Sequence, residues 1–363
     1  MTGLYVHLPF CRAKCGYCDF ASAPGTPEAI DSYLGALAAE SVRHDALAGS
    51  FSTLYIGGGT PSILSQAQLR RLFGVLEALT GPVEGLKEST FEANPESLDA
   101  DKTALLKATG ISRVSLGLQA AQDRLLKKLG RVALREDFVR AFRSLRAAGF
   151  DNINADLMCG LPGQTEADLR ESLDLLLGLG PEHVSLYALE IHEGTPFHAA
   201  GVREEPEAAA AMYETAADIL KRAGLMRYEI SNFAKPGKES LHNLNYWDQG
   251  EYLGLGTGAA SYLGGARGAN TAVTADYVSA LLAGLAAPQQ YSERLEGRAK
   301  TAERIMLGLR KTAGIELPED IFIEFKVEIG RLLEAGLIER TDGSIRIKPD
   351  KFYVSNAVFR EFV

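Results

Sequence analysis

The sequence predicts an α/β fold in which a partial (β/α)6 barrel is followed by a C-terminal helical, winged-helix-like domain. A chain of 363 residues with 46% hydrophobic residues is long enough for one large core and a smaller module. Between residues 3 and about 235, short apolar runs alternate with amphipathic stretches, which is typical of βα units on a parallel sheet. From about residue 295 the pattern changes to two helices and a hairpin.

The apolar runs define the expected strands, and the segments between them begin with helix signals. Ser65 with Gln68 and Thr165 with Asp168 have capping-box spacing, and Pro27 suits the first turn of a helix. The expected strands are residues 4–8, 53–57, 88–93, 113–117, 152–157 and 183–188, with 226–231 as an extension of the sheet. Parallel strands of this kind carry functional groups at their C-terminal ends.

The second half of the chain is expected to contain a connecting region and a small domain. The predicted boundaries are 1–235 for the barrel, 236–294 for the connection and 295–363 for the C-terminal domain. Segment 250–268 is rich in glycine, which predicts a turn-filled connection. Asp342-Gly343 is the predicted turn of the C-terminal hairpin. We expect this domain to pack against the barrel or a partner rather than bind DNA.

Charge and hydropathy exclude several classes of protein. The formal net charge of -9, without a run of Lys or Arg, argues against nucleic-acid binding because a phosphate backbone requires a concentrated basic face. The N-terminus lacks the basic and apolar regions of a signal peptide, and no run approaches 18 apolar residues. We therefore expect a cytoplasmic protein without a transmembrane segment.

Three of the four cysteines lie close together in the loop after the first expected strand. Cys11, Cys15 and Cys18 form a C-x3-C-x2-C run, while Cys159 stands apart. Three thiolates at this spacing can hold one side of a 4Fe-4S cluster and leave one iron open for another ligand. The alternatives are a zinc site with His7 as a fourth ligand, or a redox pair formed by Cys15 and Cys18.

The cysteine run resembles the signature of the radical SAM superfamily. Within that superfamily, residues 5–11 (YVHLPFC) resemble the start of the oxygen-independent coproporphyrinogen III oxidase-like group, and the likeness extends over nearly the whole chain. The resemblance implies a 4Fe-4S cluster whose open iron binds the amino and carboxylate groups of S-adenosylmethionine (SAM).

The resemblance also implies which residues bind SAM. Gly58, Gly59 and Thr60 follow the second strand in a glycine-rich turn, which by itself is equally consistent with a tight connection. At four strand ends or just after them, polar residues match SAM-contacting positions, although each alone is as consistent with an ordinary hydrogen bond. The remaining implied SAM contacts are Glu92, Gln119, Arg131, Asp156, Tyr5 and Tyr17, of which Tyr17 replaces a phenylalanine.

The chain departs from the oxidase at one informative position. Phe20 stands where the oxidase has a fourth cysteine, and a sister branch of heme chaperones shares this change. That branch carries an H-N-x-x-Y-W motif, which residues 242–247 match in full. The resemblance implies heme contact by His242, with Tyr246 and Trp247 as ring contacts, because imidazole can ligate iron while flat rings cover the macrocycle. A hydrogen-bonded core histidine is the alternative.

The resemblance favours a heme chaperone that binds heme and transfers it to an acceptor apoprotein, such as a respiratory enzyme. The rival is a radical SAM enzyme of the coproporphyrinogen oxidase type, against which Phe20 argues. His192 and His198 are further candidate heme ligands, and no C-x-x-C-H motif indicates covalent attachment. We expect a monomer or weak homodimer.

Overall fold

A curved sheet carries the main body of the protein. The computed structural model describes residues 1–341 and 343–362. Its large sheet has the strand order β12-β11-β10-β9-β1-β2-β3-β4-β5-β6-β8-β7. The six central strands are parallel, which confirms the predicted α/β architecture. They are β1 (Gly3–Leu8), β2 (Thr53–Gly58), β3 (Glu88–Ala93), β4 (Arg113–Gln119), β5 (Ile153–Cys159) and β6 (His183–Ala188).

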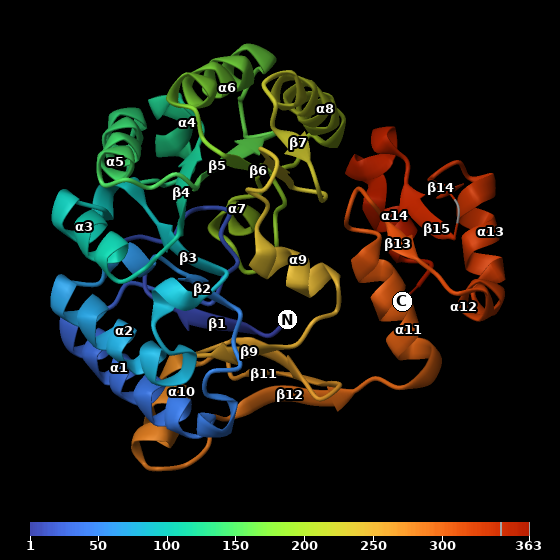
Figure 1. Ribbon diagram of the computed structural model, residues 1–363. Helices are drawn as coiled ribbons and strands as arrows, with labels where there is room; N and C mark the ends of the chain where they lie inside the picture. Colours follow the sequence, from blue (N-terminus) through green and yellow to red (C-terminus); the bar gives the residue numbers. More distant parts are fainter. Residues whose placement is uncertain (342, 363) are drawn as a thin grey trace.

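Helices cover the outer face of this sheet (Figure 1). The predicted capping boxes are present at Ser65–Gln68 and Thr165–Asp168, and Thr26 caps the helix that begins at Pro27. The helices that follow the strands are α1 (Pro27–Val42), α2 (Gln66–Thr80), α3 (Ala100–Ala108), α4 (Asp123–Lys128), α5 (Arg135–Ala147), α6 (Glu166–Leu179), α7 (Pro196–Ala199) and α8 (Pro206–Arg222). Short 3₁₀ turns occupy Asp45–Leu47, Pro61–Ile63, Val83–Gly85, Pro95–Ser97 and Pro349–Val354.

Side chains alternate between the two faces of each central strand. In β1, Leu4, Val6 and Leu8 are buried in the main apolar core, whereas Tyr5 and His7 bond to each other through Tyr5 Oη and His7 Nδ1, 2.9 Å apart. The apolar core therefore lies on the helix-covered face, and the opposite, concave face is polar.

The sheet is extended at the seventh predicted run, but by two short antiparallel strands of which only the first lies within residues 226–231. These are β7 (Met226–Arg227) and β8 (Asn232–Ala234), and β8 pairs with β6. The helix α9 (Leu241–Trp247) follows them.

The glycine-rich segment 250–268 is not the turn-filled connection that its composition predicts. It forms β9 (Tyr252–Leu255), β10 (Ala260–Leu263) and the start of β11 (Ala266–Asn270), and is followed by α10 (Thr274–Leu282) and β12 (Gln289–Arg294). β9 pairs in parallel with β1, so it supplies the hydrogen bonds that β1 would otherwise lack. Glycine is required here by close packing, because a Cβ at Gly254 would lie 2.1 Å from the Ala260 carbonyl oxygen.

The C-terminal part has an apolar core of its own. It contains α11 (Gly297–Gly308), β13 (Ile315–Glu316), α12 (Glu319–Glu324), α13 (Lys326–Glu334), β14 (Ile338–Thr341), β15 (Ser344–Ile347) and α14 (Ser355–Phe359). The β14–β15 hairpin is antiparallel as predicted, while Asp342 of its expected turn lies outside the described residues. Figure 1 shows this domain beside the barrel, with α9 between them.

Candidate functional site

The three clustered cysteines line one cavity with a volume of about 520 Å³. All three are free thiols on the loop after β1. The loop is fixed by a bond from Gly16 N to Leu129 O (2.9 Å) and by Thr60 Oγ1, which donates to Cys11 Sγ (3.4 Å). Burial raises the pKa of Cys15 while the nearby Arg131 guanidinium lowers it, so a positive charge stands ready to stabilise the thiolate.

The donor set fits an iron-sulfur cluster better than the alternatives. In residues 1–341 and 343–362, no three His, Cys, Asp or Glu side chains are grouped to hold a single metal ion. His7, the candidate fourth zinc ligand, is buried, and its ring nitrogens contact Tyr5 Oη and the Ala21 carbonyl oxygen (3.1 Å). Cys159 is buried away from this cavity, and burial raises its pKa to about 12.

The glycine turn after β2 brings backbone to the cavity wall. Gly58 has φ +106°, and a Cβ there would lie 2.7 Å from the His7 ring. A Cβ at Gly59 would lie 2.6 Å from the Phe10 carbonyl oxygen. Only glycine allows this close approach, so the turn presents backbone groups rather than side chains to a ligand.

Glu92 faces the cavity from near the end of β3. Its Oε1 accepts from Tyr55 Oη at 2.6 Å and its Oε2 accepts from Gly58 N at 3.1 Å. Burial raises its pKa to about 7, with the Asp156 carboxylate adding to the shift. A carboxyl group held in this way can accept from a ligand hydroxyl or ammonium and would be more fully ionised beside a cation.

Asp156 occupies the corresponding position in β5. Its carboxylate accepts from Asn154 Nδ2 (2.7 Å) and lies 3.3–3.4 Å from Ser115 Oγ. Burial raises its pKa as well. Two buried carboxyl groups thus share one cavity, which favours a ligand that carries positive charge or several hydroxyl groups.

Arg131 has donors to spare on the same wall. Its Nη2 donates to Asn94 Oδ1 (3.1 Å) and to Gly117 O (2.9 Å), while its Nε is buried without a partner in the described part of the chain. Gln119 has φ +70°, which is rare for a residue other than glycine, and it lies at an irregularity in the β4–β5 register. Polar groups from several strand ends thus line one cavity and keep hydrogen-bonding capacity that a ligand could use.

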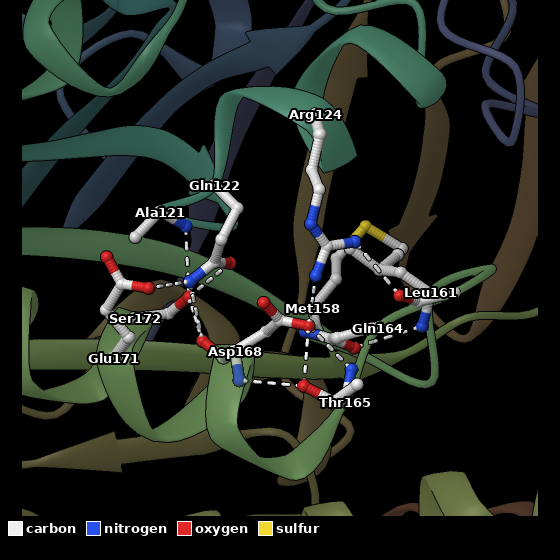
Figure 2. A network of polar contacts seen from close by, with 11 residues as sticks. Ala121, Gln122, Arg124, Met158, Leu161, Gln164, Thr165, Asp168, Glu171 and Ser172 are labelled. Carbon is white, nitrogen blue, oxygen red and sulfur yellow. Dashed lines mark hydrogen bonds and ion pairs between the residues drawn. The ribbon is translucent and has the colours of Figure 1, made fainter.

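A polar network holds the loops behind this wall (Figure 2). Gln164 accepts from Leu161 N (3.0 Å) and donates to the carbonyl oxygen of Met158 (3.1 Å), a residue that also lines the cavity. Ser172 of α6 accepts from Ala121 N at 2.9 Å, two residues after Gln119. The Gln164 bonds thus brace the loop after β5 internally, and the Ser172 bond ties the loop after β4 to α6.

The structure brings most of the sequence-predicted SAM residues together, but not all. Tyr17 lines the cavity, whereas Tyr5 does not. Asn94 is a site residue that the sequence analysis missed: its Nδ2 donates to Thr60 Oγ1 (3.1 Å), and its Oδ1 accepts from Arg131. Its position directly before Pro95 in the strand-end segment Glu92–Pro95 was the available signal.

The predicted heme residues lie elsewhere. His242 is fully buried in α9, where its Nδ1 bonds to Thr53 Oγ1 (2.8 Å) and its Nε2 to Tyr246 Oη (2.7 Å). Thr53 begins β2, so this contact lies at the N-terminal ends of the strands, opposite to the cysteine loop. Burial lowers the pKa of His242 to about 3. In this conformation neither ring nitrogen is available to iron, so direct ligation, which stays a prediction, would require α9 to move.

Two other residues of the motif are related to the cavity, Asn243 directly and Trp247 through Arg310. Asn243 lines the cavity, and the Trp247 ring stacks on the guanidinium of Arg310, which also lines it, at 4.2 Å. Arg310 follows α11 in the C-terminal domain. His192, the alternative ligand, lines the cavity mouth with its Nε2 3.8 Å from Asp19, and His198 does not line it.

A partial barrel with three cysteines beside a glycine turn and strand-end carboxylates defines a radical SAM protein. Residues 5–176 match the family model described as "Radical SAM superfamily". The structure of coproporphyrinogen III oxidase (HemN) from Escherichia coli superimposes with a TM-score of 0.85, covering 99% of this chain and 89% of that one at 24% identity. That likeness establishes the shared fold.

Sequence similarity narrows the class further. The heme chaperone HemW of Bacillus subtilis (strain 168) is 37% identical over 379 residues, which span 100% of this chain and 99% of that protein. HemW of Escherichia coli (strain K12) is 36% identical over 70% of this chain and 68% of its own length. The chain belongs to the HemW family.

Proposed function

We propose that this protein is a heme chaperone, which binds heme as cargo and transfers it to an acceptor apoprotein. The observation that carries the proposal is the end-to-end similarity to HemW of Bacillus subtilis, 37% identity across 99% of that protein. The cavity beside the cysteine loop supports it, because its volume of about 520 Å³ leaves space for a sizeable ligand.

The cofactors of this function are a 4Fe-4S cluster and SAM. We propose Cys11, Cys15 and Cys18 as the cluster ligands, since their free thiols line one cavity. A bound cluster would supply an open iron for SAM and a source of single electrons. We assign SAM contacts to the cavity-lining residues of the predicted set, which are Tyr17, Gly58, Gly59, Thr60, Glu92, Gln119, Arg131 and Asp156.

The chaperone is favoured over a porphyrinogen oxidase by one residue at the cavity mouth. Phe20 is 59% exposed and lines the cavity, where the oxidase-like motif has a cysteine. Unlike a cysteine, an exposed aromatic ring can neither ligate a metal nor take part in thiol chemistry, but it can cover the face of a flat apolar ligand. The geometry therefore supports heme contact rather than the oxidase reaction at this position.

The surroundings of this function are also proposals. No helix among the described residues is long and apolar enough to cross a membrane. A cluster built on reduced thiols requires a reducing compartment, which favours the cytoplasm. We propose a monomer or weak homodimer that hands heme to an apoprotein, such as a respiratory enzyme.

Anaerobic reconstitution tests the function. The reconstituted protein should give a Soret band with heme and pass that heme to an apoprotein, and it should not convert coproporphyrinogen to protoporphyrinogen under reducing conditions with SAM. The Cys15→Ser variant is the control for whether transfer needs the cluster. Porphyrinogen conversion without heme binding would overturn the proposal in favour of the enzyme.

A further inference from the structure

An arginine from the C-terminal domain lines the barrel cavity without a direct ion pair to any carboxylate of the described residues. Arg310 lines the cavity together with Asn243, Ser231 and Tyr187. Its side chain makes no hydrogen bond and no ion pair within residues 1–341 and 343–362, and its Nε is buried without a partner. A half-buried guanidinium without a direct ion pair can take one from a ligand, so Arg310 points to a ligand that carries an anionic group.

The guanidinium plane is held by aromatic rings. Arg310 Cζ lies 4.2 Å from the centroid of the Trp247 ring and 5.7 Å from that of Phe359. Stacking fixes the orientation of the planar fork and leaves its edge free for a bidentate contact with a carboxylate. Trp247 is the only tryptophan of the chain and ends the H-N-x-x-Y-W motif.

The protein's own carboxylates do not satisfy this arginine. Burial lowers the pKa of Arg310 and the carboxylates of Glu229 and Glu190 raise it, but in the described residues neither carboxylate forms an ion pair with Arg310. Glu229 Oε1 instead accepts from Ser231 N at 3.0 Å. The guanidinium edge thus remains available from the cavity side.

We propose that Arg310 binds a propionate carboxylate of the heme and that Trp247 is a positioning residue that orients the guanidinium. This inference rests on the proposed function, since the carboxylate belongs to the heme cargo. The residues of the H-N-x-x-Y-W motif then have different roles. His242 anchors α9 to the barrel, Asn243 lines the cavity, and Trp247 orients the Arg310 guanidinium. The C-terminal domain then also has a direct part in binding.

Esterified heme separates this role from a structural one. Heme dimethyl ester lacks the two propionate charges of heme and carries a methyl group on each side chain instead. Binding of each porphyrin to the reconstituted protein is followed by its Soret band. The wild-type protein should prefer heme over the ester by about 10- to 100-fold, the range expected for hydrogen bonds to a charged group. Arg310→Gln should reduce that preference to within about threefold by weakening heme and leaving the ester unchanged.

Matched variants complete the test. Arg304 lies exposed on α11, so Arg304→Gln removes the same charge and should keep the wild-type preference. Trp247→Phe should give an intermediate preference, and so should Arg310→Lys, which keeps a cation and provides the test if Arg310→Gln does not fold. An unchanged preference in both Arg310 variants, or none in the wild type, would overturn the inference alone. A wild-type protein that binds neither porphyrin would overturn the proposed function.

Discussion

Two glutamates on one strand show how differently the two ends of the barrel are built. Glu88 begins β3, and its carboxylate accepts from Leu241 N (2.8 Å), His242 N (3.1 Å) and Ser240 Oγ (3.1 Å). Four residues later, Glu92 accepts only from Tyr55 Oη and Gly58 N, and it faces the cavity. The carboxylate of Glu88 is occupied by hydrogen bonds from the first residues of α9, whereas that of Glu92 keeps free lone pairs for a ligand.

The same contrast holds for the surroundings of each glutamate. At the N-terminal ends of the strands, called here the closed end, His242 and Thr53 are fully buried and bond to each other. At the C-terminal ends, the open end that carries the cavity, Arg131 keeps a buried Nε without a partner in the described chain. The side chains that hold α9 are therefore already hydrogen-bonded, whereas Glu92 and Arg131 keep hydrogen-bonding capacity on the cavity side.

The largest expected effect concerns the open end. Replacing Cys11, Cys15 or Cys18 with Ser should abolish the broad visible absorbance of the reconstituted cluster, because each thiolate is one of only three proposed protein ligands. Cys159→Ser is the control and should retain about four irons per chain. Iron analysis and absorbance spectroscopy measure both, and an intact cluster without Cys15 would contradict the assignment.

The two glutamates provide the second test. Glu92→Gln should weaken SAM binding by about 10- to 100-fold, since a charged hydrogen bond contributes about 1.5–3 kcal/mol. Asp156→Asn should act in the same direction. Glu88→Gln, on the same strand, should leave SAM affinity within about twofold while it lowers the free energy of unfolding. Calorimetry on cluster-loaded protein measures affinity, and equal losses at Glu88 and Glu92 would remove the distinction between the two ends.

The closed end should make the fold sensitive to acid. The pKa of His242 falls from 6.5 to about 3 because burial penalises the charged ring. The unfolded chain therefore binds the proton first, so this stabilisation is complete above about pH 6.5 and is lost as the pH falls toward 3. At pH 5 the loss from His242 should be about 2 kcal/mol.

Denaturant unfolding between pH 7.5 and pH 5 checks this expectation. His242→Gln should reduce the steepness of the decline by about one proton, while His183, whose pKa burial also lowers, keeps its own part. The same decline in the variant as in the wild type would show that His242 is not the group responsible. An altered Soret band of bound heme in His242→Gln, with stability unchanged, would instead favour iron ligation.

The smallest expected effect concerns one hydroxyl group. Tyr246→Phe removes the bond to His242 Nε2 at 2.7 Å and should cost about 1 kcal/mol of stability. Tyr291→Phe is a suitable control because Tyr291 is exposed on β12. Should both substitutions cost the same, the tyrosine would not hold the imidazole in place.

Several features were determined by the sequence because they depend on local physics. The period of apolar residues defines β1 to β6. Two helix starts are fixed by capping boxes that each span only four residues, Ser65–Gln68 and Thr165–Asp168. The cysteine spacing is local as well, so the loop could be recognised before any contact was known. Strand-end residues such as Glu92 were implied by the family resemblance, and the rule that parallel strands gather their ends agrees with that choice.

Only the tertiary structure decided the features that depend on distant partners. The glycine-rich segment 250–268 forms strands because β9 pairs with β1. These two strands are separated in the sequence by all the other strands of the parallel barrel. The environment of His242 is set by Thr53 and Glu88, and the Trp247 ring contacts Arg310, which is distant in the sequence. A histidine or tryptophan beside a motif reads the same whether it is free or satisfied, because the groups that satisfy it are brought together by packing and not by sequence proximity.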